Sequence, residues 1–230
     1  MSDPTSTHKV AAVTGGMGGI GQGIVVALTQ RDFDVVVCDR TIDPAIAESM
    51  TTNAAPGARL SFVKNDLADS ADLPRFVDEM FAAFGHLDCL VNNAGVSAKS
   101  RGDLLDVSAE SYDLNFTMNT RGAFFLTQTV CKKMLAAEGE FPESARSVIF
   151  ISSSNAVIAA PECGEYAMSK AAVAMISFSS RASLLSTAGA RPKMSGAPSR
   201  QWLRVNFPSQ PAPRFRSMAG CTSTNTEAGI

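Results

Sequence analysis

Two side chains in the second half of the chain stand where they could move a proton. Tyr166 and Lys170 are four residues apart, in Tyr-Ala-Met-Ser-Lys, and would share one face of a helix. A free phenol titrates at about pH 10, whereas an ammonium group one turn away favours the ionised form. Tyr166 could therefore act as general acid or base. Ser153, thirteen residues earlier, could donate a hydrogen bond to a carbonyl oxygen. A Tyr-x-x-x-Lys pair alone is common, so its meaning depends on the segments around it.

The segment 14–21, Thr-Gly-Gly-Met-Gly-Gly-Ile-Gly, has the composition of a phosphate-binding turn. An apolar stretch precedes it and a stretch of helical spacing follows it. A strand, a glycine turn and a helix N-terminus form an anion site, because unpaired N–H groups and the helix dipole face it. The pyrophosphate of a dinucleotide suits such a site, with Gly15, Met17, Gly18, Gly19, Ile20 and Gly21 as candidate contacts. A glycine turn that binds nothing is the alternative.

An acidic residue ends the second predicted strand. Asp39 stands 18 residues beyond Gly21, where a carboxylate can accept hydrogen bonds from the adenosine ribose. Its charge would repel a 2′-phosphate, so Asp39 favours NAD over NADP. Arg40 follows directly and could pair with that phosphate instead. A residue that merely ends the strand is the other interpretation of Asp39.

Predicted strands and helices alternate along the chain. Apolar runs predict strands over 9–13, 34–39, 60–64, 87–91 and 147–151. Helical spacing predicts helices over 22–30, 44–52, 70–84, 108–137 and 165–185. Ser70 is expected to cap the third of these helices. The alternation predicts an α/β fold of the Rossmann type, a single doubly wound parallel sheet flanked by helices.

Five features in collinear order resemble the short-chain dehydrogenase/reductase family. They are the glycine loop, Asp39, the Asn-Asn-Ala-Gly tetrad at 92–95, Ser153, and the pair Tyr166 and Lys170. The resemblance covers about residues 9 to 176 and implies hydride transfer between a nicotinamide cofactor and a carbonyl or hydroxyl group. Its implied catalytic residues are Asn119, Ser153, Tyr166 and Lys170.

The resemblance also implies individual roles. Asn93, Ala94 and Gly95 would line the cofactor, and Asp66 and Leu67 would meet its adenine ring. Tyr166 and Lys170 would also contact the cofactor, and Lys170 would hold the nicotinamide ribose. Asn119 would kink its helix and hold a water of the proton relay, with a satisfied structural asparagine as the alternative. The stretches 102–119 and 164–166 most resemble 3-oxoacyl-[acyl-carrier-protein] reductases, which makes an acyl thioester the favoured small-molecule substrate.

Composition restricts the partners and the setting. With a net charge of −2 and 18% charged residues, neither nucleic acid nor a membrane is an expected partner. Neither a signal peptide nor a membrane span is expected. Five scattered cysteines favour a reduced, cytoplasmic setting, and two histidines predict neither a zinc site nor a histidine-based triad. Family members pair through two long helices, here 108–137 and 165–185, so a homodimer or homotetramer is expected.

The resemblance ends after about Ile176. Residues 177–230 hold seven basic residues and one acidic residue, and apolar periodicity fades beyond Leu185. A family member would continue with a strand and a Pro-Gly loop that grips the nicotinamide. We therefore divide the chain into a catalytic domain, 1–189, and an atypical tail, 190–230, which is either out of frame or divergent and partly disordered. Without that loop the chain would be a catalytically impaired dinucleotide-binding protein, the alternative to an active enzyme.

Overall fold

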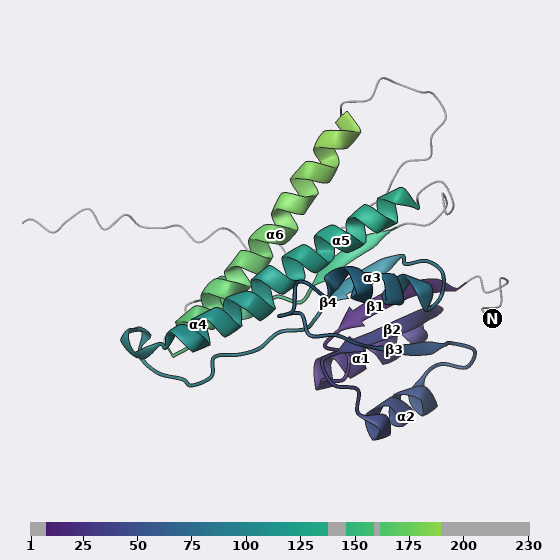
Figure 1. Ribbon diagram of the computed structural model, residues 1–230, viewed down its shortest axis with the longest axis horizontal. Coiled ribbons are helices and arrows are strands. Elements are labelled where there is room, and N and C mark those ends of the chain that lie inside the picture. Colours follow the sequence, from purple (N-terminus) through teal and green to yellow (C-terminus); the bar gives the residue numbers. More distant parts are fainter. Residues whose placement is uncertain (1–7, 138–145, 159–161, 190–230) are drawn as a thin grey trace, which may run out of the picture.

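Five parallel strands form one sheet in the part of the chain that the structure describes. The structure is a computed structural model, and it describes residues 8–137, 146–158 and 162–189 (Figure 1). The strands are β1 (Lys9–Thr14), β2 (Phe33–Asp39), β3 (Leu60–Lys64), β4 (Cys89–Asn92) and β5 (Ser147–Phe150). Their order is β3-β2-β1-β4-β5. The predicted doubly wound parallel sheet is confirmed, while the predicted tail, 190–230, lies outside the described residues.

Helices flank this sheet. They are α1 (Gly19–Thr29), α2 (Pro44–Asn53), α3 (Leu73–Ala82), α4 (Ala109–Asn115), α5 (Ala123–Ala136) and α6 (Gly164–Gly189), with short 3-10 turns η1 (Leu104–Asp106) and η3 (Ser154–Ala156). In Figure 1, α4 and α5 run in line with each other, and α6 crosses beside them. Within the described ranges, no helix is long and apolar enough to cross a membrane.

Strand β1 is fixed from both faces. Successive side chains of a strand point to opposite sides, so Val10 and Ala12 join the core that α3 and α5 cover. Ala11 and Val13 join the core that α1 and α2 cover. All four side chains are fully buried. The central strand therefore gives the glycine turn that follows it a rigid base.

Two predicted helix starts differ from the structure. Helix α1 begins at Gly19, so the last glycines of the loop form its first turn. The predicted cap at Ser70 is wrong: α3 begins at Leu73, and the Ser70 hydroxyl instead accepts a hydrogen bond from Arg121 Nη1 at 2.9 Å. Pro74 stands in the first turn of α3. Because proline presets the helical φ and lacks an N–H group, this start does not depend on a capping side chain.

The helix predicted over 108–137 has a change of pitch at its centre. Helix α4 passes into a π-helical segment, η2 (Phe116–Gly122), which passes into α5. Asn119 lies in the middle of η2 and is 2% exposed. A π segment takes more residues per turn than an α-helix and is often found at functional sites. The structure thus shows a change of helix type at Asn119, while α4 and α5 stay in line, so the kink implied there stays a prediction.

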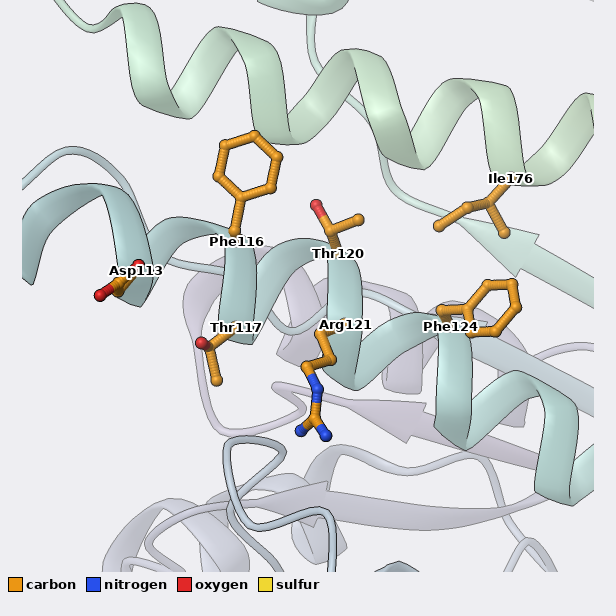
Figure 2. Close-up of a pocket in the computed structure, with 7 residues that line it drawn as sticks. All are labelled: Asp113, Phe116, Thr117, Thr120, Arg121, Phe124 and Ile176. Carbon is orange, nitrogen blue, oxygen red and sulfur yellow. The ribbon is translucent and has the colours of Figure 1, made fainter. Parts of the chain in front are cut away.

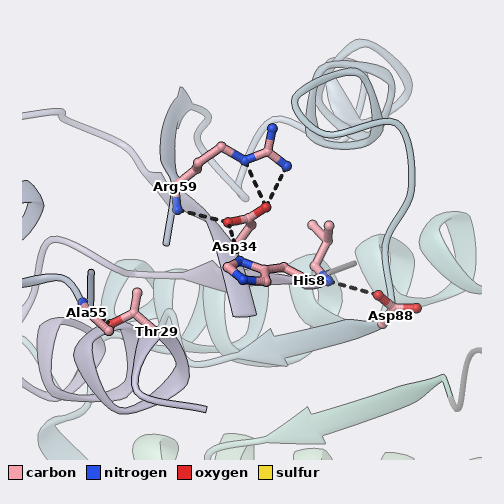
Figure 3. A network of polar contacts seen from close by, with 7 residues as sticks. His8, Thr29, Asp34, Ala55, Arg59 and Asp88 are labelled. Carbon is pink, nitrogen blue, oxygen red and sulfur yellow. Dashed lines mark hydrogen bonds and ion pairs between the residues drawn. The ribbon is translucent and has the colours of Figure 1, made fainter. Parts of the chain in front are cut away.

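Buried carboxylates occupy the amino ends of the strands (Figure 3). Asp34 in β2 is fully buried and accepts hydrogen bonds from Arg59 N at 2.8 Å and Arg59 Nε at 2.9 Å. Asp88, just before β4, accepts one from Val10 N at 2.8 Å, and His86 Nε2 lies 3.2 Å from its carboxylate. Burial by itself raises the pKa of Asp34, but its hydrogen bonds and the charge of Arg59 outweigh burial and lower it.

Candidate active site

The glycine loop closes against the residues that follow β4. Gly15 has a φ of 63°, in the left-handed region that favours glycine, and a Cβ built on it would lie 2.8 Å from Ala94 Cα. A Cβ on Gly21 would lie only 2.1 Å from Gly15 O. Only a glycine at position 21 therefore lets the first turn of α1 pack directly on the backbone of the loop.

The N-terminus of α1 offers both space and donors to an anion. A Cβ on Gly19 would meet no atom within 4 Å, and the N-cap residue, Gly18, has no side chain that could occupy the first N–H groups. The first N–H groups of α1 have no acceptor within the helix. Ile20, beside them, is 69% exposed. This arrangement fits the pyrophosphate of a dinucleotide.

One hydroxyl group fastens the ends of β1 and β4 together. Thr14 Oγ1 accepts hydrogen bonds from Asn93 N at 3.1 Å and Ala94 N at 3.0 Å. The Asn93 side chain in turn donates to Thr14 O and Gly15 O, both at 3.0 Å. The sheet reverses its winding between these two strands, which is where open α/β sheets bind ligands. The predicted cofactor residues of the loop and the tetrad thus meet at one place.

Asp39 is tied to the same loop. Its Oδ2 accepts a hydrogen bond from Met17 N at 3.0 Å, and its Oδ1 accepts one from Arg40 N at 2.7 Å. The carboxylate is half-buried, the Arg40 side chain is exposed, and the Met17 side chain is buried in the core. The Asp39 carboxylate therefore stands at the end of β2 beside the glycine loop.

The two adenine candidates have different surroundings. Asp66 is half-buried, and its Oδ1 accepts a hydrogen bond from Ala68 N at 3.0 Å. Leu67 is 5% exposed and belongs to the core. A Cβ on Gly122 would lie 2.7 Å from Leu67 O, so this turn packs directly on η2. The Leu67 side chain thus faces the core.

Lys170 links four parts of the site. It is 6% exposed, and its Nζ donates to Ile151 O at 3.0 Å, at the end of β5. A Cβ on Gly95 would lie 3.2 Å from that Nζ and 2.9 Å from Asn119 Oδ1. The centroid of the Tyr166 ring is 6.0 Å from Nζ. Burial lowers the pKa of Lys170, because desolvation disfavours the charged amine.

The Asn119 side chain makes four hydrogen bonds within the protein. Its Oδ1 accepts from Val96 N at 2.8 Å, and its Nδ2 donates to Val96 O and Ser169 Oγ, both at 2.9 Å. A longer bond of 3.3 Å reaches Asn115 Oδ1. These contacts agree with the alternative of a satisfied structural asparagine. Its part in a water relay stays a prediction.

Ser153 lies on the loop after β5, two residues beyond the carbonyl that binds Lys170. Its Oγ accepts a hydrogen bond from Asn155 N at 3.2 Å and so starts the turn η3. The side chain is half-buried. No described contact joins its hydroxyl to Tyr166. Ser153 comes from the loop between β5 and η3, whereas Tyr166 comes from α6.

Several polar residues of this region were missed by the sequence reasoning. Thr14 begins the glycine loop, and Ser169 lies between Tyr166 and Lys170, and no role is predicted for either. Ser111 and Asn115 also are buried. Their spacing with Asn119, at every fourth residue, is the signal that could have identified a polar helix face.

Comparison with known proteins identifies the family. The profile of the short chain dehydrogenases matches residues 9–188. The chain belongs to this family. Short-chain dehydrogenases are oxidoreductases that bind a nicotinamide dinucleotide and small-molecule substrates.

Individual relatives match over part of their length. A hydroxynaphthalene reductase-like protein of Metarhizium guizhouense is 38% identical over 120 residues, 52% of this chain and 44% of that protein. A short-chain type dehydrogenase/reductase of Picea abies is 33% identical over 174 residues, 73% of this chain and 62% of that protein. The structure of a Brucella melitensis 3-oxoacyl-[acyl-carrier protein] reductase in complex with NAD is 41% identical, with a TM-score of 0.68 over 73% of this chain and 64% of that chain. The short-chain dehydrogenase described here thus spans about half the length of the curated relatives it matches.

Proposed function

We propose that this short-chain dehydrogenase uses NAD to oxidise a hydroxyl group or, in reverse, to reduce a carbonyl group. The observation that carries the proposal is the position of Lys170. One buried ammonium group lies beside Gly95, Asn119 and the ring of Tyr166 while it is bonded to the end of β5. A cation so placed can stabilise negative charge on a nearby oxygen and bind a ribose hydroxyl.

The proton chemistry is assigned to residues of the chain. Tyr166 gives a proton to the substrate oxygen in reduction and takes one back in oxidation. Ser153 donates a hydrogen bond to the same oxygen and holds it in place. Asn119 anchors the water that replaces the proton. When bound, the nicotinamide supplies or accepts the hydride.

The proposed cofactor is NAD rather than NADP. The open N-terminus of α1 would hold the pyrophosphate, and Asn93, Ala94 and Gly95 would line the nicotinamide half. Asp66, with the backbone of Leu67, would meet the adenine. Asp39 supports the choice of NAD, because its charge disfavours a phosphate on the neighbouring ribose. Arg40 is the residue that could reverse this preference.

The proposed substrate is a 3-oxoacyl thioester. The stretches 102–119 and 164–166 support it, and so does the identity of 41% with the Brucella reductase. Turnover of a 3-oxoacyl thioester should exceed that of a simple ketone of equal length. Equal rates for both would leave only the broader class of carbonyl compounds.

A homodimer or homotetramer is the proposed assembly. An open hollow of about 320 Å³ lies between η2, α5 and α6 (Figure 2). Its apolar lining includes Phe116, Phe124 and Ile176, and Phe124 is 42% exposed. Large exposed apolar side chains of this kind mark association surfaces. Sedimentation of the wild type beside a Phe124→Glu variant tests the assignment.

A reduced, cytoplasmic setting is proposed as well. Cys38, Cys89, Cys131 and Cys163, the cysteines within the described residues, are all free thiols. Burial raises the pKa of Cys38 and Cys89, which keeps both thiols protonated.

A second candidate function is that of a catalytically impaired dinucleotide-binding protein. The sequence of the tail, 190–230, supports this candidate. The tail lacks the Pro-Gly loop with which members of the family grip the nicotinamide. Residues 1–189 would then form a binding domain without its lid. NADH binding without turnover on any carbonyl would favour this alternative, and the gene's nucleotide sequence would decide whether the tail is out of frame.

The proposal is tested by replacing the proton donor. In a version with a family-like C-terminus, Tyr166→Phe should lower turnover by about a thousandfold and change the NADH dissociation constant by less than about threefold. Tyr112→Phe is the matched control, because Tyr112 is the only other tyrosine. Substantial residual turnover in Tyr166→Phe would remove Tyr166 from its assigned role.

A further inference from the structure

A buried carboxyl group stands directly before Tyr166 and has no part in the chemistry proposed above. Glu165 is the second residue of α6 and is 1% exposed. Its Oε1 accepts a hydrogen bond from Ser111 Oγ at 2.7 Å. Its Oε2 is buried and has no hydrogen-bond partner among the described residues. A buried acidic group with one oxygen unused destabilises a fold, so this side chain calls for a reason beyond packing.

The partner of Glu165 connects three segments. Ser111 lies in α4, and its Oγ accepts a hydrogen bond from Lys99 N at 3.3 Å as well as donating to Glu165. Lys99 belongs to the loop that follows Gly95. A single buried hydroxyl therefore holds together α4, α6 and the loop that continues from the cofactor-binding tetrad.

A second polar contact holds α6 one turn further on. Ser169 Oγ accepts a hydrogen bond from Asn119 Nδ2 at 2.9 Å and donates to Tyr166 O at 2.8 Å. Thr120 Oγ1 donates to Ser169 O at 3.2 Å. The turn of α6 that carries Tyr166 is thus fixed at its end by Ser169 and at its start by Glu165.

The type of residue at position 165 suits this task. An acidic group in the first turn of a helix is stabilised by the helix dipole. A hydrogen bond between a hydroxyl and a carboxyl group is directional, whereas an apolar side chain would allow the helix to slide or rotate. Buried polar groups without full hydrogen bonding are expected mainly at functional sites.

We propose that Glu165 is a positioning residue, which acts through Ser111 to fix the turn of α6 that presents the Tyr166 hydroxyl to the substrate. This inference rests on the proposed function, because the position of Tyr166 matters only if Tyr166 transfers a proton. It adds a residue that acts through Ser111 to the residues assigned to the proton chemistry.

Three variants of the full chain test the role by steady-state kinetics. Glu165→Leu and Ser111→Ala remove the hydrogen bond from either side, and each should lower kcat by about tenfold while the NADH dissociation constant changes by less than about twofold. Glu165→Gln keeps an acceptor for Ser111 and should restore kcat to within about threefold of the wild type. The control is Thr29→Ala, which removes a buried hydroxyl far from the site and should leave kcat unchanged.

A readout that needs no turnover separates this inference from the proposed function. With Tyr112→Phe as background, fluorotyrosine labelling gives one fluorine NMR signal, which comes from Tyr166. Glu165→Leu should shift or broaden that signal, and Glu165→Gln should restore it. If the wild type turns over no carbonyl, the proposed function fails, and the NMR signal alone then decides about Glu165. An unchanged signal in Glu165→Leu, an unchanged kcat, or a parallel loss of kcat and NADH affinity would each overturn the positioning role.

Discussion

The polar groups at the two ends of the parallel strands differ in their hydrogen-bond partners. At the amino ends, the buried carboxylates of Asp34 and Asp88 are paired with groups of the chain itself. At the carboxyl ends, Asp39 accepts two backbone hydrogen bonds, but the first turn of α1 lies beside open space and keeps unused donors. The carboxylates at the first end have partners within the chain, whereas the second end leaves backbone donors free for a ligand.

This difference separates stability from binding within one sheet. Substitutions at the amino ends should lower the free energy of unfolding and leave cofactor affinity intact. Substitutions at the carboxyl ends should act mainly on cofactor affinity. Changes that fail to separate in this way would show that the two ends are coupled through the strands.

The largest effect is expected at Gly21. A Cβ there would lie 2.1 Å from Gly15 O, so Gly21→Ala must push the first turn of α1 away from the loop. NADH affinity should fall at least about a hundredfold, which is about 2.7 kcal/mol, as measured by fluorescence titration. Gly23→Ala is the control, since a Cβ at Gly23 meets nothing within 4 Å and should leave affinity unchanged. Near-normal NADH binding by Gly21→Ala would contradict the assigned loop.

A substitution at Asp34 should change the free energy of unfolding by about as much as Gly21→Ala changes the free energy of NADH binding. Asp34→Ala leaves Arg59 without its buried partner and should lower the free energy of unfolding by about 3 kcal/mol, with NADH affinity preserved. Because the folded pKa of Asp34 is lowered, its contribution is present above the unfolded value of about 3.9 and is lost as pH falls through the folded value. The control is Asp78→Ala, which removes a carboxylate whose side chain is 74% exposed. It should lower the free energy of unfolding, measured by urea denaturation, by less than about 1 kcal/mol.

A smaller effect is expected in the choice of cofactor. The charge of Asp39 should make NADH bind at least about tenfold tighter than NADPH, or about 1.4 kcal/mol. Parallel fluorescence titrations with the two nucleotides measure the ratio. Equal affinities would mean that Arg40 offsets the carboxylate, and Arg40→Ala should then restore the preference for NADH.

The smallest effect concerns His86. The hydrogen bond with Asp88 and the negative charge of Asp88 raise the pKa of His86, although partial burial by itself would lower it. Its contribution is therefore fully present below the unfolded value of about 6.5 and is lost as pH rises through the raised folded pKa. The difference in stability between wild type and His86→Gln should be below about 1 kcal/mol and should shrink as pH rises. A difference that grows with pH would contradict the pairing.

Local chemistry made much of this architecture predictable. The five strands followed from apolar runs, and the loop at 14–21 followed from its glycines. The start of α3 was not predictable in this way. Ser70 has the side chain of a typical helix cap, but Pro74 presets the backbone and the helix begins at Leu73. Contacts between distant residues were also out of reach: Glu165 and Ser111 are 54 positions apart, and nothing in either local pattern reveals the other. The roles of the site residues stay predictions until variants are measured.

The π-helical segment η2 has a consequence for insertions and deletions. A π turn holds more residues than an α turn. Removing one residue from Phe116–Gly122 would therefore let this segment wind as an ordinary α-helix, and Asn119 would lose its position opposite Val96 and Ser169. We expect homologues to vary in length at surface loops and to keep the length of this segment constant.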